Sequence, residues 1–311
     1  MTKHEILKKY WGYDSFRGIQ EQIIDEIMAG RDVLGLMPTG GGKSLTFQVP
    51  ALAMEGVCLV ISPLIALMKD QVQNLRKRNI KAAAIYSGMS HSKALETMEN
   101  AVYGGVKILY VSPERLESEL FRAKLQHLQI RLFTIDESHC ICQWGYDFRP
   151  SYLKIAEIRD IHPKAPVLAL TATATNETAE DIQHQLKFRA KNCIKMSFER
   201  PNIAYIVQRS KEKLSDVANI LQKNEGTAII YVSSRERTTE IADFLQKLDI
   251  TAEGYNAGLT AMHRDIRQQK WTDDRTRVIV ATNAFGMGID KPDVRVVIHL
   301  NCPTSIEAYF Q

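Results

Sequence analysis

Residues 37–44 read Met-Pro-Thr-Gly-Gly-Gly-Lys-Ser, a glycine-rich turn between an apolar run and a candidate helix. The apolar run, residues 32–36, is typical of a buried strand, and residues 45–54 can form the helix, although we expect Pro50 to kink or end it. Glycine lets backbone N–H groups turn inward around a phosphate at the N-terminus of such a helix. A strand, a glycine turn and a helix in this order predict an α/β fold with a phosphate site.

The turn carries the residue types that a nucleotide site requires. Lys43 can place its charge on the β- and γ-phosphates, and the Ser44 hydroxyl is a suitable ligand for Mg²⁺. The strict pattern has glycine where this chain has Met37, so the motif is a variant. The residues that we expect to bind the nucleotide are Thr39, Gly40, Gly41, Gly42, Lys43 and Ser44.

A second motif, Leu-Phe-Thr-Ile-Asp-Glu-Ser-His, occupies residues 132–139. Its apolar part predicts a strand, so Asp136 and Glu137 emerge at a strand's carboxyl end, where open α/β sheets bind their ligands. We expect Asp136 to bind Mg²⁺ together with Ser44, and Glu137 to orient or deprotonate an attacking water molecule. An unrelated acidic strand end is the alternative, but two motifs in this order disfavour it. Together they predict hydrolysis of a nucleoside triphosphate.

The composition is that of a globular protein. Of 311 residues, 45% are hydrophobic and 24% are charged, and this length predicts two domains. The N-terminus lacks an apolar signal core and no apolar run is long enough to span a bilayer, so we expect a cytoplasmic protein without membrane contact. The five cysteines form no Cys-x-x-Cys pairs, which argues against a disulfide framework or a zinc site. A net charge of +4 is too small to indicate nucleic-acid binding by itself.

Apolar runs alternate with amphipathic stretches along the chain, which predicts βαβ units and a parallel sheet. After residues 198–202 the pattern starts again, so we expect two tandem α/β domains, residues 1–202 and residues 203–311, with a linker near Pro201. Two similar folds in tandem suggest a cleft whose closure depends on the nucleotide. The runs that we predict to be strands are residues 57–61, 107–112, 132–136, 167–171, 227–232, 277–282 and 295–300.

Further motifs follow in a fixed order. They are Gly-Tyr at 12–13, Phe-Arg at 16–17, Gln20, Ser-Pro-Leu-Ile-Ala-Leu-Met-Lys-Asp-Gln at 62–71, Ser-Pro-Glu-Arg at 112–115, Leu-Thr-Ala-Thr-Ala at 170–174, Ile-Tyr-Val-Ser-Ser-Arg at 230–235 and Ala-Thr-Asn-Ala-Phe-Gly-Met-Gly-Ile-Asp-Lys-Pro-Asp-Val at 281–294. With the two motifs above, this series resembles a superfamily-two DNA helicase of the RecQ family across essentially the whole chain. The resemblance implies two tandem RecA-like domains with mostly parallel sheets, the second of them incomplete.

The same resemblance implies an activity: a DNA helicase core that uses Mg·ATP to move 3′ to 5′ along single-stranded DNA and to unwind partly duplex DNA, in repair and recombination. A monomer is expected. An RNA helicase is an alternative of the same class, and a nucleotide-dependent DNA-binding module without turnover is one of a different class.

Residues 139–150 read His-Cys-Ile-Cys-Gln-Trp-Gly-Tyr-Asp-Phe-Arg-Pro and look like the aromatic-rich loop of the RecQ family. Trp144, Tyr146 and Phe148 offer faces on which unpaired bases can stack, and Arg149 can meet a phosphate or an aromatic plane. Gln143 is implied as a further DNA contact. The alternative is a hydrophobic loop pinned to the core, which the polar residues of the loop disfavour. The loop also argues against an RNA helicase.

The resemblance assigns the adenine site to residues near the N-terminus. Tyr13 and Arg17 would enclose the base, and the Gln20 amide, which offers a donor and an acceptor, would match the adenine edge. The family has Pro-Gly where this chain has Gly18-Ile19, but the spacing is kept. Taken alone, Tyr13 would be an ordinary residue at a helix boundary.

Other roles are implied only by the resemblance. His139 joins Lys43, Asp136 and Glu137 as a catalytic residue, and the two threonines of residues 170–174 would couple the nucleotide to DNA, although they alternate as plain strand residues would. Lysine and arginine contacts to DNA phosphates could equally be solvated surface charges. The coupling residues are Thr171, Thr173, Gly286, Gly288 and Asp290, and the phosphate contacts are Lys69, Arg115 and Arg235.

The family continues past a Tyr-Phe-Gln like that at 309–311 into a motif whose arginines reach the γ-phosphate. Such an arginine finger is worth about 10³ to 10⁵ in rate. We therefore expect residues 1–311, as part of a longer protein, to bind ATP and DNA but to hydrolyse and unwind poorly.

Overall fold

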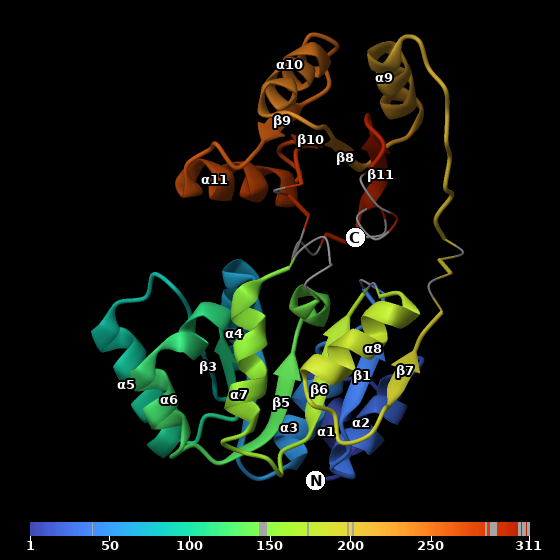
Figure 1. Ribbon diagram of the computed structural model, residues 1–311. Helices are drawn as coiled ribbons and strands as arrows, with labels where there is room; N and C mark the ends of the chain where they lie inside the picture. The colour runs from blue at the N-terminus through green and yellow to red at the C-terminus, as the bar shows by residue number, and fades with distance from the viewer. Residues whose placement is uncertain are drawn as a thin grey trace. The chain divides into compact units, whose positions relative to one another are not determined.

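The computed structural model describes residues 1–38, 40–142, 148–172, 174–197, 199–200, 202–283, 285–286, 291–303, 306 and 309. The chain divides into two compact units, Met1–Glu199 and Arg200–Gln311 (Figure 1). Each unit is an α/β fold built on a parallel sheet, which confirms the fold class expected from the sequence.

The first unit contains a seven-stranded sheet in the order β3-β4-β2-β5-β6-β1-β7, and every strand pair in it is parallel. Strands β5, β6 and β1 are neighbours, so the segments that follow them meet at one edge of the sheet. The register pairs Ile135 with Ala169 and Leu36 with Thr171. The strands are β1 (Val33–Leu36), β2 (Val57–Ile61), β3 (Ala82–Ile85), β4 (Ile108–Val111), β5 (Ile130–Ile135), β6 (Val167–Thr171) and β7 (Cys193–Lys195).

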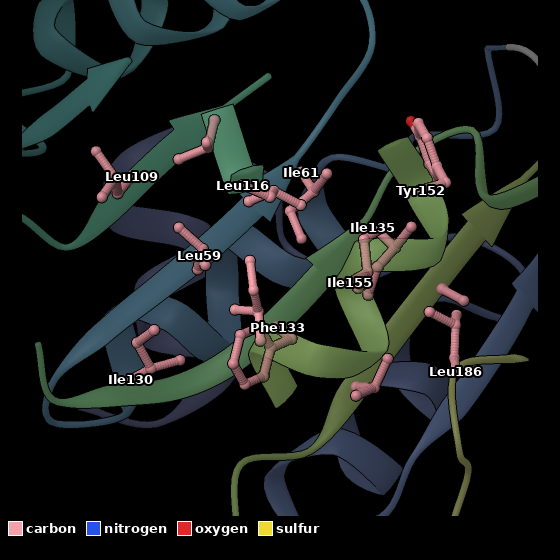
Figure 2. Close-up of a cluster of buried hydrophobic side chains, with 14 of the residues drawn as sticks. Leu59, Ile61, Leu109, Leu116, Ile130, Phe133, Ile135, Tyr152, Ile155 and Leu186 are labelled. Carbon is pink, nitrogen blue, oxygen red and sulfur yellow. The ribbon is translucent and has the colours of Figure 1, made fainter. Parts of the chain in front are cut away.

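Helices cover both faces of this sheet. Successive strand residues point to opposite faces, so β2 sends Leu59 and Ile61 into one buried cluster and Cys58 and Val60 into the other. Figure 2 shows the first cluster, in which Ile135, Tyr152 and Ile155 lie on the same face. The helices are α1 (Lys3–Trp11), α2 (Gln20–Met28), α3 (Leu45–Ala53), α4 (Ile65–Lys77), α5 (His91–Tyr103), α6 (Glu119–Leu125), α7 (Ile155–Arg159) and α8 (Asn176–Gln185), with the 3₁₀ turns η1 (Pro113–Glu117), η2 (Ser138–Ile141) and η3 (Pro150–Lys154).

Of the two outcomes expected at Pro50, a kink or an end, the structure contradicts the end, because helix α3 continues to Ala53. Proline removes only its own N–H from the ladder. Its carbonyl still accepts a bond from the Met54 N–H at 2.9 Å, and Pro50 is buried. Tertiary packing therefore supports the last turn of this helix.

The second unit holds a four-stranded parallel sheet in the order β11-β8-β10-β9. One side of it packs around Ile230, Val280 and Leu245, and the other around Trp271 and Phe285. Its strands are β8 (Thr227–Tyr231), β9 (Ala252–Tyr255), β10 (Val278–Ala281) and β11 (Val294–His299), and its helices are α9 (Lys213–Lys223), α10 (Arg235–Gln246) and α11 (Ala261–Thr272).

Candidate functional site

The glycine turn joins the carboxyl end of β1 to the N-terminus of α3. Gly40 and Gly42 adopt φ values of 78° and 75°, in the left-handed region that favours glycine. A Cβ atom on Gly41 would lie 2.9 Å from the Pro38 carbonyl oxygen, and one on Gly42 would lie 2.3 Å from the Gln20 amide nitrogen. The turn is therefore closed tightly over the start of α3, the arrangement that binds a phosphate at a helix N-terminus.

Lys43 and Glu137 face one another across this edge of the sheet. The Lys43 Nζ atom lies 3.6 Å from Glu137 Oε1, and both side chains are less than one-fifth exposed, at 17% and 16%. Two segments separated by more than ninety residues therefore bring a cation and a carboxylate together at the end of β1 and β5.

Asp136 is partly buried and lies close to this pair. Its Oδ2 accepts a bond from the Ser62 hydroxyl at 3.2 Å. Burial and then the negative charge of Glu137 raise the pKa of Asp136, and Lys43 and Ser62 oppose them only in part. Asp136 and Glu137 carry two negative charges next to the single positive charge of Lys43, and carboxylate oxygens are ligands that suit a divalent cation.

Glu137 has a left-handed backbone conformation, and one of its carboxylate oxygens has no hydrogen-bond partner among the described residues. Its φ and ψ are both 48°, in the left-handed region. Within the described part of the chain its Oε2 is buried without a hydrogen-bond partner, and it lies 3.4 Å from Nδ1 of His139. This oxygen is available to accept a proton or to hold a water molecule.

His139 connects the acidic segment to the neighbouring strand. It is buried in η2, and its Nδ1 lies 2.8 Å from the Thr171 hydroxyl at the end of β6. His139, expected to be catalytic, and Thr171, expected to couple the nucleotide to DNA, are thus in direct contact. A shift in the position of the Thr171 hydroxyl can therefore move His139, which lies 3.4 Å from the Glu137 carboxylate.

Near the N-terminus, Arg17 lies over the exposed Tyr13 ring, with Cζ 5.7 Å from the ring centroid. The amide of Gln20 is buried, and its oxygen accepts a bond from the Arg17 N–H at 2.9 Å. Its nitrogen donates to the carbonyl oxygens of Gly41 at 3.3 Å and Gly42 at 3.1 Å. Gln20 therefore connects the Tyr13–Arg17 pair to the glycine turn, a contact that the sequence did not reveal.

The basic residues expected at DNA differ in their surroundings. Arg115 is engaged by the protein, because its Nε and Nη2 atoms donate to the carbonyl oxygens of Tyr86 at 2.9 Å and Met89 at 2.7 Å. This clamp on the segment after β3 is a structural role that the sequence interpretation did not include. Lys69 is exposed, with Nζ 4.9 Å from the Tyr86 ring centroid, and Arg235 is exposed at the start of α10.

The structure also describes three further predicted residues, Phe148, Arg149 and Gly286. Phe148 and Arg149 are half-buried, and the Arg149 N–H donates to the Cys140 carbonyl oxygen at 2.9 Å. At Gly286, φ is 136° and an added Cβ would meet the Tyr231 hydroxyl at 2.6 Å, so only glycine fits. The predicted site residues that lie outside the described residues are Thr39, Gln143, Trp144, Thr173, Gly288 and Asp290.

Across the described ranges, no group of three or more His, Cys, Asp or Glu side chains is arranged to hold a metal ion. Nor does any helix among the described residues combine the length and the apolar character needed to cross a bilayer.

Two family models match the chain. The model for DEAD/DEAH box helicases matches residues 17–182, and the model for the helicase conserved C-terminal domain matches residues 212–311. The ATP-dependent DNA helicase RecQ of Pasteurella multocida is 40% identical over 100% of this chain and 49% of its own length. That of Bacillus subtilis is 41% identical over 98% of this chain and 52% of its own length. The chain spans about half the length of these two relatives.

Solved structures share the fold at low sequence identity. The helicase MrfA, solved bound to DNA, has a TM-score of 0.78 at 19% identity, over 99% of this chain and 48% of that chain. The Mycobacterium smegmatis helicase Lhr, solved with single-stranded DNA and AMP-PNP, has a TM-score of 0.76 at 18% identity, over 99% of this chain and 44% of that chain.

Proposed function

Because the chain belongs to the DEAD/DEAH box helicase family, we propose that it is the ATP-dependent motor core of a RecQ-type DNA helicase. The motor hydrolyses Mg·ATP, moves 3′ to 5′ along single-stranded DNA and separates duplex strands, in repair and recombination. RecQ DNA helicases are 40% identical over the whole chain, but so is a mimivirus relative named a putative RNA helicase, so the choice of DNA rests on the aromatic-rich loop. The observation that carries the proposal is the contact between Lys43 and Glu137, with the partly buried Asp136 beside it.

In this proposal each residue at the sheet edge has one task. The glycine turn and Lys43 hold the phosphates, and Ser44 and Asp136 would hold Mg²⁺. When bound, Mg²⁺ neutralises charge on the phosphate oxygens. Glu137 orients the attacking water and accepts its proton through the buried Oε2 atom, while Lys43 lies 3.6 Å from the other carboxylate oxygen, Oε1.

The adenine base lies against Tyr13 and Arg17, with Gln20 at its edge. A cation and an aromatic face are both suited to a flat base. The same Gln20 amide contacts the glycine turn, so recognition of the base is communicated to the phosphate site. Single-stranded DNA binds at the aromatic-rich loop, residues 139–150, by base stacking that tolerates any sequence.

The test is nucleotide binding and turnover by the chain, with and without a single-stranded DNA oligonucleotide, beside Lys43→Ala and an RNA oligonucleotide of the same sequence. We expect Mg·ATP binding that DNA strengthens and RNA does not, and Lys43→Ala should weaken that binding at least tenfold. The motor proposal would be rejected if DNA binds equally well in the absence and presence of nucleotide and no turnover occurs, since that is the behaviour of a passive DNA-binding module.

A further inference from the structure

Tyr152 is buried directly beneath the acidic segment. Its side chain, labelled in Figure 2, is 0% exposed in the 3₁₀ turn η3. Its hydroxyl donates to the main-chain carbonyl oxygen of Asp136 at 2.9 Å. Burial raises the pKa of the phenol well above its usual value, so the hydroxyl keeps its proton and remains a donor. The hydroxyl is therefore the hydrogen-bond donor to the Asp136 carbonyl.

The carbonyl that Tyr152 holds belongs to the peptide group between Asp136 and Glu137. The orientation of that peptide plane sets ψ of Asp136 and φ of Glu137. The φ of Glu137 is 48°, which is unfavourable for a residue with a side chain and persists only where neighbours fix it. The Tyr152 hydroxyl is one such neighbour, because rotation of this peptide would break its bond.

Tyr152 is also attached to the base of the aromatic-rich loop. The Tyr152 N–H donates to the Arg149 carbonyl at 2.9 Å, and the Arg149 N–H donates to the Cys140 carbonyl at 2.9 Å. The Cys140 N–H in turn donates to the Glu137 carbonyl at 3.0 Å. These three main-chain hydrogen bonds and the bond from the Tyr152 hydroxyl connect Arg149, near the end of the loop, to Asp136 and Glu137.

These hydrogen bonds lead to an inference that rests on the proposed function and goes one step beyond it. We propose that Tyr152 is a positioning residue: its hydroxyl fixes the Asp136–Glu137 peptide in the orientation that Mg·ATP binding requires. Through the same bond, Tyr152 links that peptide to the base of the aromatic-rich loop, so DNA at the loop alters the geometry of the carboxylate pair. Tyr152 touches neither nucleotide nor DNA.

The test is Tyr152→Phe, which removes one oxygen atom and keeps the buried ring. A matched control is Tyr110→Phe, because Tyr110 is also buried in the same unit, at 2% exposure, and its hydroxyl accepts a bond from Gln48 at 3.5 Å. The affinity of each chain for a fluorescent, non-hydrolysable ATP analogue is measured in EDTA, in Mg²⁺, and in Mg²⁺ with single-stranded DNA. Thermal unfolding confirms that each variant is folded.

In Tyr152→Phe we expect the gain in affinity on adding Mg²⁺ to fall about fivefold, the equivalent of one neutral hydrogen bond. The further gain on adding DNA should largely disappear, while affinity in EDTA stays within about twofold of wild type because the glycine turn is untouched. Tyr110→Phe should keep both gains. A general loss of folding would lower the affinity in EDTA as well, so this measurement separates positioning from damage.

If Tyr152→Phe keeps both gains at wild-type size, the inference about Tyr152 is wrong and the proposed function stands. If the affinity in EDTA falls as far as the affinity in Mg²⁺, Tyr152 supports the fold and not the carboxylate pair, which also overturns the inference. A wild-type chain in which neither Mg²⁺ nor DNA changes nucleotide affinity refutes the proposed function itself, and the inference with it.

Discussion

The Gln20 side chain donates a hydrogen bond to the carbonyl oxygen of Gly42 at 3.1 Å, which fastens the start of α2 to the glycine turn. The resemblance assigns Gln20 only to the adenine edge, so the two roles must be separated by experiment. In Gln20→Glu the oxygen that accepts the Arg17 N–H is kept, but the donor becomes a carboxylate oxygen facing two carbonyls. We expect the affinity for ATP to fall about tenfold or more, because a buried acceptor then lacks a donor.

Inorganic tripolyphosphate distinguishes the two roles of Gln20, because it fills the phosphate site without a base. Its affinity should fall together with that of ATP if Gln20 supports the turn, and should not change if Gln20 only reads adenine. Gln183→Glu is a matched control, since the Gln183 amide also accepts from one N–H, of Asn192 at 2.8 Å, and donates to one carbonyl, of Ala179 at 2.9 Å. Equal losses in both variants would show a general effect of a buried charge.

Asp136 should reduce the stability of the ligand-free fold. Burial and the charge of Glu137 raise its pKa from 3.8 to about 6. Because the folded-state pKa lies above the unfolded value, the folded chain binds more protons between these two values. This group therefore lowers the free energy of unfolding as pH rises from about 4 to about 6. At pH 7, Asp136→Asn should raise the free energy of unfolding by about 1–3 kcal/mol.

Urea unfolding of wild type and Asp136→Asn across that pH range measures the effect. The variant should be more stable at pH 7, equally stable near pH 4, and should lose the stabilisation that Mg·ATP gives to the wild type. A variant that is less stable at pH 7 would mean that the Ser62 and Lys43 contacts outweigh the cost of burying the carboxylate.

Asp32 should have the opposite effect on stability. Its carboxylate accepts bonds from Arg159 at 2.6 Å, from the Arg189 guanidinium at 2.9 Å and from the Val167 N–H at 2.9 Å. Burial alone would raise its pKa, but the bonds from Arg189 and Arg159 outweigh burial and lower it. Its contribution is therefore present above the unfolded value, near pH 4, and is lost as pH falls through the lowered folded value.

Asp32→Asn should lower the free energy of unfolding by about 3–5 kcal/mol, because it leaves the buried Arg159 without its counter-charge. Asp160→Asn breaks an exposed pair with Lys187 at 2.8 Å and should cost at most about 1 kcal/mol. Urea unfolding at pH 7 compares the two. If the two variants lose similar amounts of unfolding free energy, burial of the Asp32–Arg159 pair does not determine its contribution to stability.

Sequence patterns predicted the central strands well and the sheet edges poorly. The runs at 57–61 and 167–171 coincide with β2 and β6, since continuous apolar β-branched runs are typical of buried parallel strands. The strands that were not predicted, β3, β7 and β9, all lie at a sheet edge. Each has three or four residues, and they include alanine, glycine, lysine or glutamate, which have weak strand propensity. Pairing with a neighbour forms these strands, and a sequence pattern does not contain that information.

The same limit applies to the site. Motif spacing predicted that Lys43, Asp136 and Glu137 take part in nucleotide hydrolysis. These roles remain predictions, and the 3.6 Å contact between Lys43 and Glu137 is compatible with them. Charge alone did not reveal that Arg115 clamps two carbonyl groups, because that depends on where the segment after β3 lies. Tyr152 gave no sequence signal, since a buried tyrosine looks the same whether it fills space or holds a peptide group.

Trp271 offers a last test of packing in the second unit. It is fully buried, and its indole Nε1 is without a hydrogen-bond partner among the described residues. Its ring packs edge-on against Phe285, at 5.4 Å between centroids, and a buried N–H without a partner costs about 1–3 kcal/mol. Trp271→Phe removes that N–H and keeps an aromatic ring, so the relief should offset the lost contact area, and the free energy of unfolding should change by less than about 1 kcal/mol. Trp271→Ala should lower it by about 3–5 kcal/mol. A loss of more than about 2 kcal/mol for Trp271→Phe in urea unfolding would mean that the indole N–H contributes to the fold through a partner, for example an ordered water molecule.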